Sequence, residues 1–416
     1  MAFIQDGSPT NVSEHHLNSD TRGNNIDGKA AHSSKRVLIV GGGPVGCITA
    51  LKLGQAGIDV DIVERVSTIS DSPRAVGYYG AAQLFLNDIG MYELIRQQGF
   101  MTRGLCWRKK PTDDGEGGKE LGDMLACQPL CALDDTIFDV GAGLLNLPQA
   151  DLNKLSLSEA LKTGHVSIHF NTELVSILHN SENGVSVLAR NLETNEEKQY
   201  HANYLIGADG ASSVTRKALG LPFPGHTWPE RLISTNVYVK NGPGPTYHTH
   251  FVMDRIHYTI ATPLENPIEG KTTLWRYTIA AHPDDKRPDD ELMSDSEILQ
   301  HYENVMSGPR PLQVKIKHRS VYRIHQRLAP TMRKGNCLLV GDAGHACNVS
   351  DFHPGFHFIF CALHISRFAP CSGGARRRCE SLSSEAKSIT FRNSPTAPSA
   401  LTQAYLTPTP RLKASS

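Results

Sequence analysis

The sequence has little of what membrane, secreted and nucleic-acid-binding proteins need. Its 42 basic and 42 acidic side chains cancel over 416 residues, so nothing indicates electrostatic binding to nucleic acid or to an anionic membrane. The longest apolar run near the carboxyl end, Phe358–Leu363, is far shorter than the about 20 residues that span a bilayer. Residues 1–34 lack a signal-peptide core and are rich in Ser, Asn, Asp and Gly, which predicts a disordered leader. We therefore expect a cytoplasmic protein without a transmembrane segment and without a nucleic-acid partner.

The sequence also lacks the patterns of a disulfide framework or a metal centre. It holds nine cysteines, an odd number, and no Cys-x-x-Cys pair; Cys127 and Cys131 are the closest two. Reduced structural thiols in an intracellular protein are the better interpretation. His353 and His357 are four residues apart, but no acid accompanies them in a His-Glu-x-x-His pattern. No metal site is predicted.

What the sequence does contain is a dinucleotide-binding fingerprint within residues 35–65. An apolar run, Val37–Val40, leads into Gly41-Gly42-Gly43-Pro44-Val45-Gly46, and an apolar-periodic segment and a second apolar run ending at Glu64 follow. This order predicts a buried strand, a glycine turn, a helix and a second strand that ends in an acid. It is the context in which the glycine motif binds a nucleotide.

Each residue type in the fingerprint has a physical reason. Gly41 permits a tight exit from the strand, Gly43 lets a pyrophosphate approach the backbone, and Gly46 lets the helix pack close to the sheet. The helix N-terminus, with its unpaired amides, then faces two phosphates. Glu64 lies 18 residues after Gly46, where a carboxylate can accept both hydroxyls of an adenosine ribose. The fingerprint alone leaves both FAD and NAD open.

Two further acids directly follow predicted strands. One strand ends at Gly207-Ala208-Asp209-Gly210, and a later one ends at Gly341-Asp342-Ala343-Gly344-His345. Ligands bind at the carboxyl ends of strands in doubly wound sheets, so Asp209 is a candidate site residue and Asp342 stands in an equivalent place.

Between the first two motifs, the sequence predicts a helix from residue 147 to residue 161 and then strands at 166–170, 174–179 and 185–190. Asn183-Gly184 separates the last two strands, which favours an antiparallel meander. Arg74 follows a proline in a loop. Its guanidinium has two interpretations, contact with a cofactor phosphate or ring carbonyl and simple solvation, and the residues alone do not choose between them.

Residues 222–321 have a different, β-rich character. In the predicted strand Thr272–Ala280, the side chains of Trp275, Tyr277 and Ile279 share one face. We favour sheet core for this face over the lining of a pocket for an aromatic substrate. A helix follows, with Ser294 as its N-cap and Glu297 three residues on.

With three motifs in this order, the chain resembles the FAD-dependent aromatic hydroxylases, the single-component flavoprotein monooxygenases typified by p-hydroxybenzoate and phenol hydroxylases. The resemblance covers residues 35–348 and implies an α/β fold, in which a Rossmann-like FAD-binding domain carries an inserted β-rich substrate domain. The expected parts are a leader (1–34), the FAD-binding domain (35–221), the substrate domain (222–321), the return of the FAD-binding domain (322–348) and a disordered tail (349–416).

The resemblance also implies a cofactor site. In this family the first motif binds the ADP half of FAD, the second contacts FAD and the passing NADPH, and the third places its aspartate on the flavin's ribitol. Carried over by position, the cofactor-binding residues are Gly41, Gly43, Gly46, Glu64, Arg74, Gln149, Asp209, Gly210, Gly341 and Asp342. The cofactor interpretation of Arg74 is thereby favoured.

The activity that the resemblance implies is hydroxylation of a phenolic or polycyclic aromatic compound with FAD as cofactor, NAD(P)H as co-substrate and O2 as oxidant. Alternatives on the same scaffold are an epoxidase and a Baeyer–Villiger-type, ring-expanding oxygenase. An alternative from another class is an inactive nucleotide-binding protein. Residues 247–258 hold three histidines and two tyrosines, but no catalytic acid or base is assigned among them.

The resemblance stops at Asn348. The family continues with a proline, a glycine-rich turn and a helix that faces the flavin, whereas this chain runs Val349-Ser350 into a Ser-, Arg- and Pro-rich tail. Val-Ser can be encoded by GTAAGT, a common splice-donor sequence, so we interpret the tail as a retained intron or a misassigned gene boundary. Genomic DNA without a downstream frame for the missing turn and helix would contradict this. A native tail would leave the reduced flavin without that helix dipole.

Overall fold

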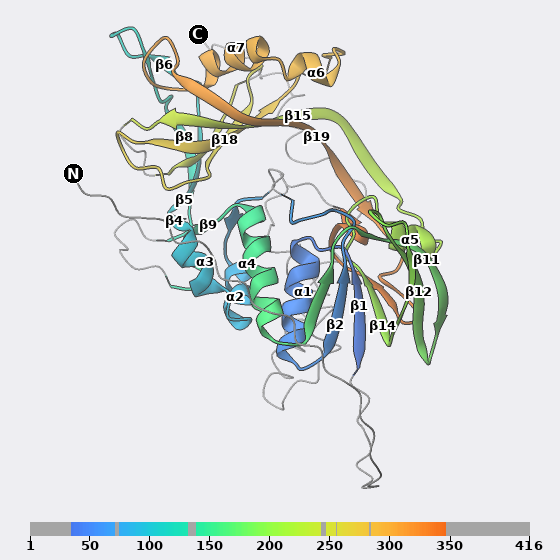
Figure 1. Cartoon of the computed structure of the whole chain (residues 1–416). Coiled ribbons are helices and arrows are strands. Elements are labelled where there is room, and N and C mark those ends of the chain that lie inside the picture. The colour runs from blue at the N-terminus through green and yellow to red at the C-terminus, as the bar shows by residue number, and fades with distance from the viewer. Residues whose placement is uncertain are drawn as a thin grey trace, which may run out of the picture. The chain divides into compact units, whose positions relative to one another are not determined.

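The computed structural model describes residues 35–70, 75–131, 139–242, 247–254, 256–282 and 284–346 (Figure 1). The predicted leader, the predicted tail and Arg74 lie outside these residues. The α/β architecture with a large β-rich part is confirmed.

A six-stranded sheet carries the three motifs. Its strand order is β10-β2-β1-β14-β21-β20. The parallel strands are β1 (Arg36–Val40), β2 (Asp59–Val63), β10 (Val166–His169), β14 (Tyr204–Gly207) and β21 (Cys337–Leu339), and β20 (Arg333–Lys334) is antiparallel at one edge. The register places Val40 beside both Val63 and Gly207. The carboxyl ends of these neighbouring strands therefore lie together.

Two helices pack side by side on one face of this sheet (Figure 1), α1 (Pro44–Gln55) and α4 (Gln149–Lys162). Leu51 of α1 and Leu152 of α4 are buried with Ile39 and Ile62 of the sheet. Pro44 begins α1, where its missing N–H costs no hydrogen bond. The same core continues under α2 (Ala81–Asp88), α3 (Tyr92–Gln98) and a small sheet of β3 (Gly77–Tyr78), β9 (Leu144–Asn146) and β4 (Phe100–Thr102).

A three-stranded antiparallel meander packs on the other face of the sheet. It consists of β11 (Thr172–Ser181), β12 (Gly184–Asn191) and β13 (Glu197–Ala202). The expected hairpin at Asn183-Gly184 is confirmed. The prediction that residues 166–170 form the first strand of the meander was wrong, because Val166 pairs in parallel with Val60 of β2. A strand that follows a helix packed on a parallel sheet extends that sheet as a βαβ unit, and the meander begins only after Asn171 turns the chain with φ of 52°.

The β-rich part is one eight-stranded sheet with the order β22-β19-β15-β18-β17-β16-β5-β8. Its strands are β5 (Gly104–Arg108), β8 (Met124–Pro129), β15 (Gly225–Lys240), β16 (Thr249–Val252), β17 (Thr259–Pro263), β18 (Thr272–Ala280), β19 (Val314–Leu328) and β22 (His345–Ala346). The hairpin of β6 (Thr112–Asp113) and β7 (Lys119–Glu120) lies between β5 and β8 in the chain. This sheet takes strands from both sides of residues 222–321, and the domain boundaries stay predictions.

Helices α6 (Asp289–Leu292) and α7 (Asp295–Val305) cover one face of the large sheet. Trp275, Tyr277 and Ile279 are buried there with Ile298 and Tyr302 of α7, so the sheet-core interpretation is confirmed. The Ser294 hydroxyl accepts a hydrogen bond from the Glu297 amide, as expected of an N-cap.

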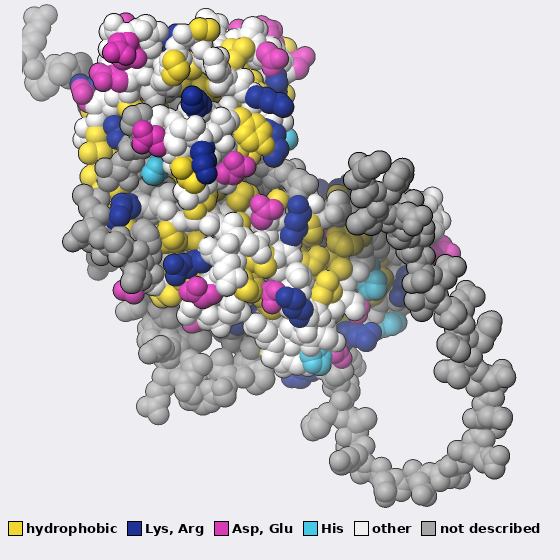
Figure 2. Space-filling model, turned by 60° about the vertical axis from the view of Figure 1, so that its left-hand side comes forward, with side chains coloured by type: hydrophobic (Ala, Val, Ile, Leu, Met, Phe, Trp, Pro, Cys, Tyr) yellow, Lys and Arg dark blue, Asp and Glu magenta, His cyan; other side chains and the backbone are white. Residues whose placement is uncertain are grey.

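The described residues include no helix that is long and apolar enough to cross a bilayer. Figure 2 shows basic and acidic side chains interspersed on the face that it draws, which matches the cancelling charges of the sequence.

Candidate cofactor site

The glycine turn between β1 and α1 is shaped by two close backbone contacts and one open position. Gly41 has φ of 107°, and a Cβ there would lie 2.5 Å from the carbonyl oxygen of Ala208. A Cβ on Gly46 would overlap the carbonyl oxygen of Gly41. Gly43, which caps α1, has no atom within 4 Å of the place where its Cβ would stand. Open space at a helix N-terminus with free amides fits a diphosphate.

Glu64 follows β2 and lies against the same turn. Its Oε2 accepts a hydrogen bond from the Gly42 amide at 2.5 Å, and its Oε1 accepts one from the Val66 amide at 3.1 Å. The carboxylate is therefore next to the glycine turn, where the sequence places a group that binds the ribose.

The carboxylate of Asp209, after β14, is held by hydrogen bonds from its own loop. Oδ1 accepts from the Ser213 hydroxyl at 2.5 Å, and Oδ2 accepts from the amide and hydroxyl of Thr215 at 2.9 and 3.0 Å. These contacts fix the start of α5 (Val214–Ala218), a role that the sequence did not reveal. Gly210 has φ of 74° and, like Gly43, has open space where a Cβ would be.

The third motif packs against the first. Gly341 begins the short 3-10 helix η1 (Gly341–Ala343), with φ of 58°. A Cβ on Gly341 would lie 3.0 Å from Cγ2 of Val45, in the first turn of α1. Asp342 is the next residue and is exposed. The structure thus brings the Gly-Asp motif to the N-terminus of α1, about 300 residues away in the sequence.

Arg216 joins the second and third motifs, and sequence reasoning gave it no function. Its side chain is buried; Nη1 donates to the carbonyl oxygen of Ala343 at 2.7 Å, and Nη2 donates to that of Ala211 at 2.8 Å. Its guanidinium carbon lies 3.8 Å from the centre of the Phe223 ring. Burial lowers the pKa of Arg216, and the charge of Asp209 partly offsets this effect. No local signal marks this residue except its place on the helix after the second motif.

Gln149 is the first residue of α4, and its backbone amide donates a hydrogen bond to the carbonyl oxygen of Ala75 at 2.9 Å. The chain just after Arg74 is therefore held at the start of α4. The contact of Arg74 with the cofactor stays a prediction. One turn further along α4, Nδ2 of the buried Asn153 donates to the carbonyl oxygen of Gly42 at 2.9 Å. Asn153 was missed because an asparagine inside a predicted helix gives no sign of what it will contact.

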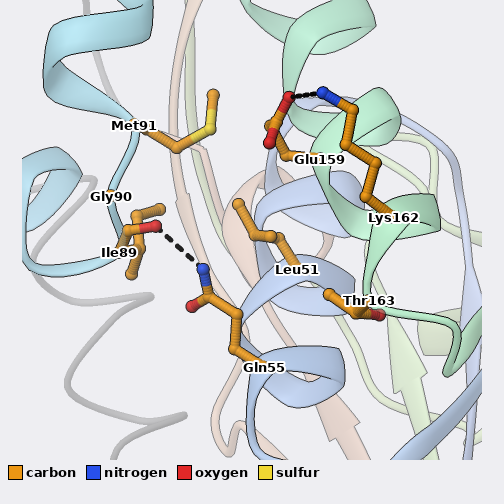
Figure 3. Close-up of a pocket in the computed structure, with 8 residues that line it drawn as sticks. All are labelled: Leu51, Gln55, Ile89, Gly90, Met91, Glu159, Lys162 and Thr163. Carbon is orange, nitrogen blue, oxygen red and sulfur yellow. Dashed lines mark hydrogen bonds and ion pairs between the residues drawn. The ribbon is translucent and has the colours of Figure 1, made fainter.

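A cavity of about 240 Å³ lies elsewhere, beyond the opposite end of α1 (Figure 3). Gln55, the last residue of α1, points toward it and donates from Nε2 to the carbonyl oxygen of Ile89 at 2.9 Å. Glu159 and Lys162 of α4 form an ion pair at its rim. Because Gly43 caps the other end of α1, this cavity is not part of the candidate cofactor site.

The face of the large sheet opposite α7 carries a polar cluster that we call the Arg276 cluster: Asn236, Arg276, His318 and Tyr322. Strand alternation puts these side chains on the face away from Val237 and Tyr277, which pack under α7. Nε of Arg276 donates to Oδ1 of Asn236 at 3.0 Å. His318 and Arg276 are paired with Asn236 on its two sides.

The Arg276 guanidinium is half-buried, and its charge affects the two neighbouring titratable groups of the Arg276 cluster. Burial lowers the pKa of Arg276 to about 10. Burial, and then the charge of Arg276, lower the pKa of His318. Burial raises the pKa of Tyr322, and its hydrogen bond with Thr278 and the charge of Arg276 act in the opposite direction. Tyr322 is still 38% exposed. A small ligand that reached this face would meet a guanidinium, an imidazole and a phenol.

Comparison with known proteins matches residues 34–351 to a family described as FAD binding domain. Para-nitrophenol 4-monooxygenase of Pseudomonas sp. (strain WBC-3) is 30% identical over 318 residues, which cover 75% of this chain and 72% of that protein. 6-Hydroxy-3-succinoylpyridine 3-monooxygenase HspB of Pseudomonas putida (strain DSM 28022 / S16) is 29% identical, over 76% of this chain and 74% of that protein. The crystal structure of p-nitrophenol 4-monooxygenase PnpA from Pseudomonas putida DLL-E4 superposes with a TM-score of 0.69 at 27% identity, covering 80% of this chain and 79% of that one.

Proposed function

We propose that this chain, which belongs to the family of FAD-dependent aromatic hydroxylases, acts on a phenolic compound. In this proposal the substrate binds as an anion beside Arg276. The protein is an oxidoreductase of the monooxygenase class, with FAD as cofactor and NAD(P)H as co-substrate. O2 is the oxidant in the proposed reaction.

The half-buried guanidinium of Arg276 carries the proposal on the substrate. Burial disfavours its charged form, as its lowered pKa reports. An anion placed against a desolvated guanidinium recovers part of that cost, and it can accept charge-assisted hydrogen bonds. Two relatives are named for a nitrophenol and a succinoyl-substituted hydroxypyridine, and both compounds form anions near neutral pH, the first at its ring hydroxyl and the second at the carboxyl of its succinoyl group. A phenolate or a phenol with an acidic substituent has the same complementarity here.

The chain's own residues then have the following proposed roles. The backbone amides of Val45 and Gly46, in the first turn of α1, hold the diphosphate of FAD, and the Glu64 carboxylate accepts hydrogen bonds from the ribose hydroxyls. Asp342 holds the sugar alcohol chain of the cofactor. Arg74 and Gln149 stay proposed cofactor contacts, as do Gly41, Gly46, Asp209, Gly210 and Gly341. Bound FAD supplies hydride acceptance from NAD(P)H and activation of O2, for which amino-acid side chains are poorly suited.

In the Arg276 cluster, the proposed role of Arg276 is to hold the substrate anion and lower the pKa of its ring hydroxyl. An ionised hydroxyl makes the ring more electron-rich and so more reactive toward an electrophilic oxygen. Tyr322 lies within the electrostatic reach of Arg276 and is partly exposed, so it is placed to donate its hydroxyl proton to the same anion.

The test uses the full chain purified with FAD and a matched set of ring compounds: 4-nitrophenol, 4-hydroxybenzoate, its methyl ester and 4-nitroanisole. We expect NAD(P)H oxidation with incorporation of one isotopically labelled oxygen atom for the phenols, and none for the anisole, whose ring oxygen cannot ionise. Comparison of the acid with its methyl ester decides whether the anion is a carboxylate or the phenolate. Equal turnover of the anisole would overturn the anion proposal, and ring expansion or an epoxide as product would establish an alternative oxygenase. Failure to bind FAD would favour the inactive nucleotide-binding protein.

A further inference from the structure

Two free cysteines lie directly opposite each other on neighbouring strands of the large sheet. β5 and β8 are antiparallel, and their register pairs Cys106 with Cys127. Side chains of directly opposed residues in an antiparallel pair lie on the same face and are close neighbours. The two thiols therefore face each other, although 20 residues stand between them in the sequence.

The hydrogen bonding between β5 and β8 shows which kind of antiparallel pair Cys106 and Cys127 form. It is the non-hydrogen-bonded kind, in which the two Cα atoms are closer together. The Leu130 amide donates to the carbonyl oxygen of Arg103 at 2.9 Å, and the register makes these residues opposite each other. Hydrogen-bonded and non-hydrogen-bonded pairs alternate along the strands. The next pair contains Pro129, which has no N–H and fits a non-hydrogen-bonded position. Two positions further on, Cys106 and Cys127 also form a non-hydrogen-bonded pair.

The geometry of that pair permits a covalent bond. Cα atoms in non-hydrogen-bonded antiparallel pairs are about 4.5 Å apart, which lies inside the range of about 4.4–6.8 Å that disulfides span. The register shift in this strand pair falls between Trp107 and Arg108, so it does not displace Cys106 from its partner.

The two cysteines differ in access. Cys106 has no exposed surface, and burial raises the pKa of its thiol. Cys127 is exposed on β8, the last strand of the sheet order, where an oxidant from solvent reaches it. The Tyr247 hydroxyl lies within hydrogen-bond reach of the Cys127 thiol. One exposed thiol that reacts first and one neighbouring thiol that resolves the product is the arrangement of a redox-active pair.

We propose that Cys106 and Cys127 close a reversible cross-strand disulfide when the protein meets a hydroperoxide. The Cys127 thiolate attacks one peroxide oxygen, the O–O bond breaks, and the other oxygen leaves as water after taking a proton. The resulting sulfenic acid is attacked by the sulfur of Cys106, which loses its proton as the sulfenic oxygen departs as a second water. Two thiols and one hydrogen peroxide thus give one disulfide and two waters, with the sulfurs oxidised by two electrons. An external dithiol reverses the change.

The bond ties the edge strand β8 to β5 and closes the intervening segment, which holds the β6–β7 hairpin, into a ring. Edge strands fray easily because only one side of their backbone is paired. Oxidation is therefore expected to slow hydrogen exchange at the β8 amides more than at β18, in the middle of the same sheet.

The experiment oxidises the reduced full chain with hydrogen peroxide, blocks the remaining thiols with N-ethylmaleimide and maps peptides without reduction. Trypsin leaves Cys106 in Gly104–Arg108 and leaves Cys127 together with Cys131 in Glu120–Lys154. We expect these two peptides to be joined, two fewer of the nine cysteines to be blocked, and both effects to disappear after dithiothreitol. The Cys131→Ser variant is the matched control, and it should form the link as the native chain does.

The Cys127→Ser variant should lose the link, and because Cys127 is exposed at a sheet edge this change is expected to leave the fold intact. A link that persists in Cys127→Ser and disappears in Cys131→Ser would overturn the proposal, as Cys131 would then be the partner. Wild-type protein that keeps all its thiols blockable after peroxide treatment would overturn it as well, with no variant needed. None of these readouts depends on flavin or on turnover.

Discussion

Nη1 of Arg216 donates a hydrogen bond of 2.7 Å to the carbonyl oxygen of Ala343, although 127 residues separate the two. A second hydrogen bond, from Nη2 to the carbonyl oxygen of Ala211, makes the same guanidinium a bridge between the loops of the second and third motifs. The planar fork of arginine suits two acceptors at once, and a lysine has no equivalent geometry. Arg216 thus determines how the two loops meet beside the candidate cofactor site.

We expect Arg216→Lys and Arg216→Met to lower the free energy of unfolding by about 2–4 kcal/mol, because two buried carbonyl groups lose charge-assisted partners. Flavin content after purification should fall with the stability. Urea denaturation and flavin absorbance measure the two effects. Arg190→Met is the control, since its pair with Glu197 lies on the surface and exposed pairs contribute about 0–1 kcal/mol. Equal losses in both variants would contradict a bridging role.

Alanine at two glycines of the first motif should separate cofactor binding from folding. Gly43 has φ of −71° and open space around its missing Cβ, so Gly43→Ala should change the free energy of unfolding by less than about 0.5 kcal/mol. It should weaken FAD binding at least about tenfold, because a methyl group would stand where a phosphate must approach the backbone.

Gly46→Ala is the opposite case, because its Cβ would overlap the carbonyl oxygen of Gly41. We expect a loss of stability of about 1–3 kcal/mol from this overpacking. Thermal unfolding of the apoprotein and titration with FAD provide both measurements for each variant. If Gly43→Ala binds FAD as tightly as the native chain, the phosphates do not lie at this turn.

Sequence reasoning succeeded where the determining interactions are local. Gly43 and Pro44 at the start of α1 follow from neighbours in the chain, and so does the Ser294 cap of α7. The placement of the motifs at adjoining strand ends also followed, because parallel strands separated by helices enter one sheet with one polarity.

It failed where a contact joins distant segments. Nothing near Cys106 in the sequence shows that β5 lies outside the six-stranded sheet. The sequence also does not show that β5 pairs in parallel with β16 of the large sheet. Asp209 is a different case, because the three hydrogen bonds that its carboxylate accepts come from Ser213 and Thr215, four and six residues away. Its role in ligand binding stays a prediction. Asn153 and Arg216 bond to backbone carbonyls, which every residue has, so no pattern of residue types marks their partners.

Substitution of Arg276 should change the choice of substrate. We expect Arg276→Met to lower kcat/KM for an ionised phenol by about 10- to 100-fold, equivalent to about 1.5–3 kcal/mol for a hydrogen bond to a charged group. Steady-state kinetics with 4-hydroxybenzoate and its methyl ester separate the two anions. A larger loss for the acid places its carboxylate at Arg276, and an equal loss for both compounds places the phenolate there. Arg323→Met, at an exposed position of β19, which β15 separates from β18, is the control. Equal losses of kcat/KM in Arg276→Met and Arg323→Met would place Arg276 in a structural role only.

The last prediction concerns acid stability and rests on His250. This side chain of β16 is buried, and burial lowers its pKa to about 4, while its hydrogen bond with the carbonyl oxygen of His248 acts in the opposite direction. Between pH 6.5 and 4 the unfolded chain binds a proton at this residue that the folded chain does not. The free energy of unfolding therefore falls as the pH falls through this window, by up to about 3 kcal/mol from this one residue.

His301, on α7, adds a second such group, because burial and the neighbouring His257 lower its pKa to about 4 as well. Urea denaturation at pH 7, 6, 5 and 4.5 should show the decline. The His250→Gln variant, which keeps a polar side chain but cannot titrate, should reduce its slope by about 1.4 kcal/mol per pH unit at most. His282→Gln, which replaces an exposed histidine, is the control. An unchanged slope in His250→Gln would mean that His250 binds its proton at the same pH in the folded and the unfolded chain. Its packing against Trp275, with ring centres 6.5 Å apart, argues against this.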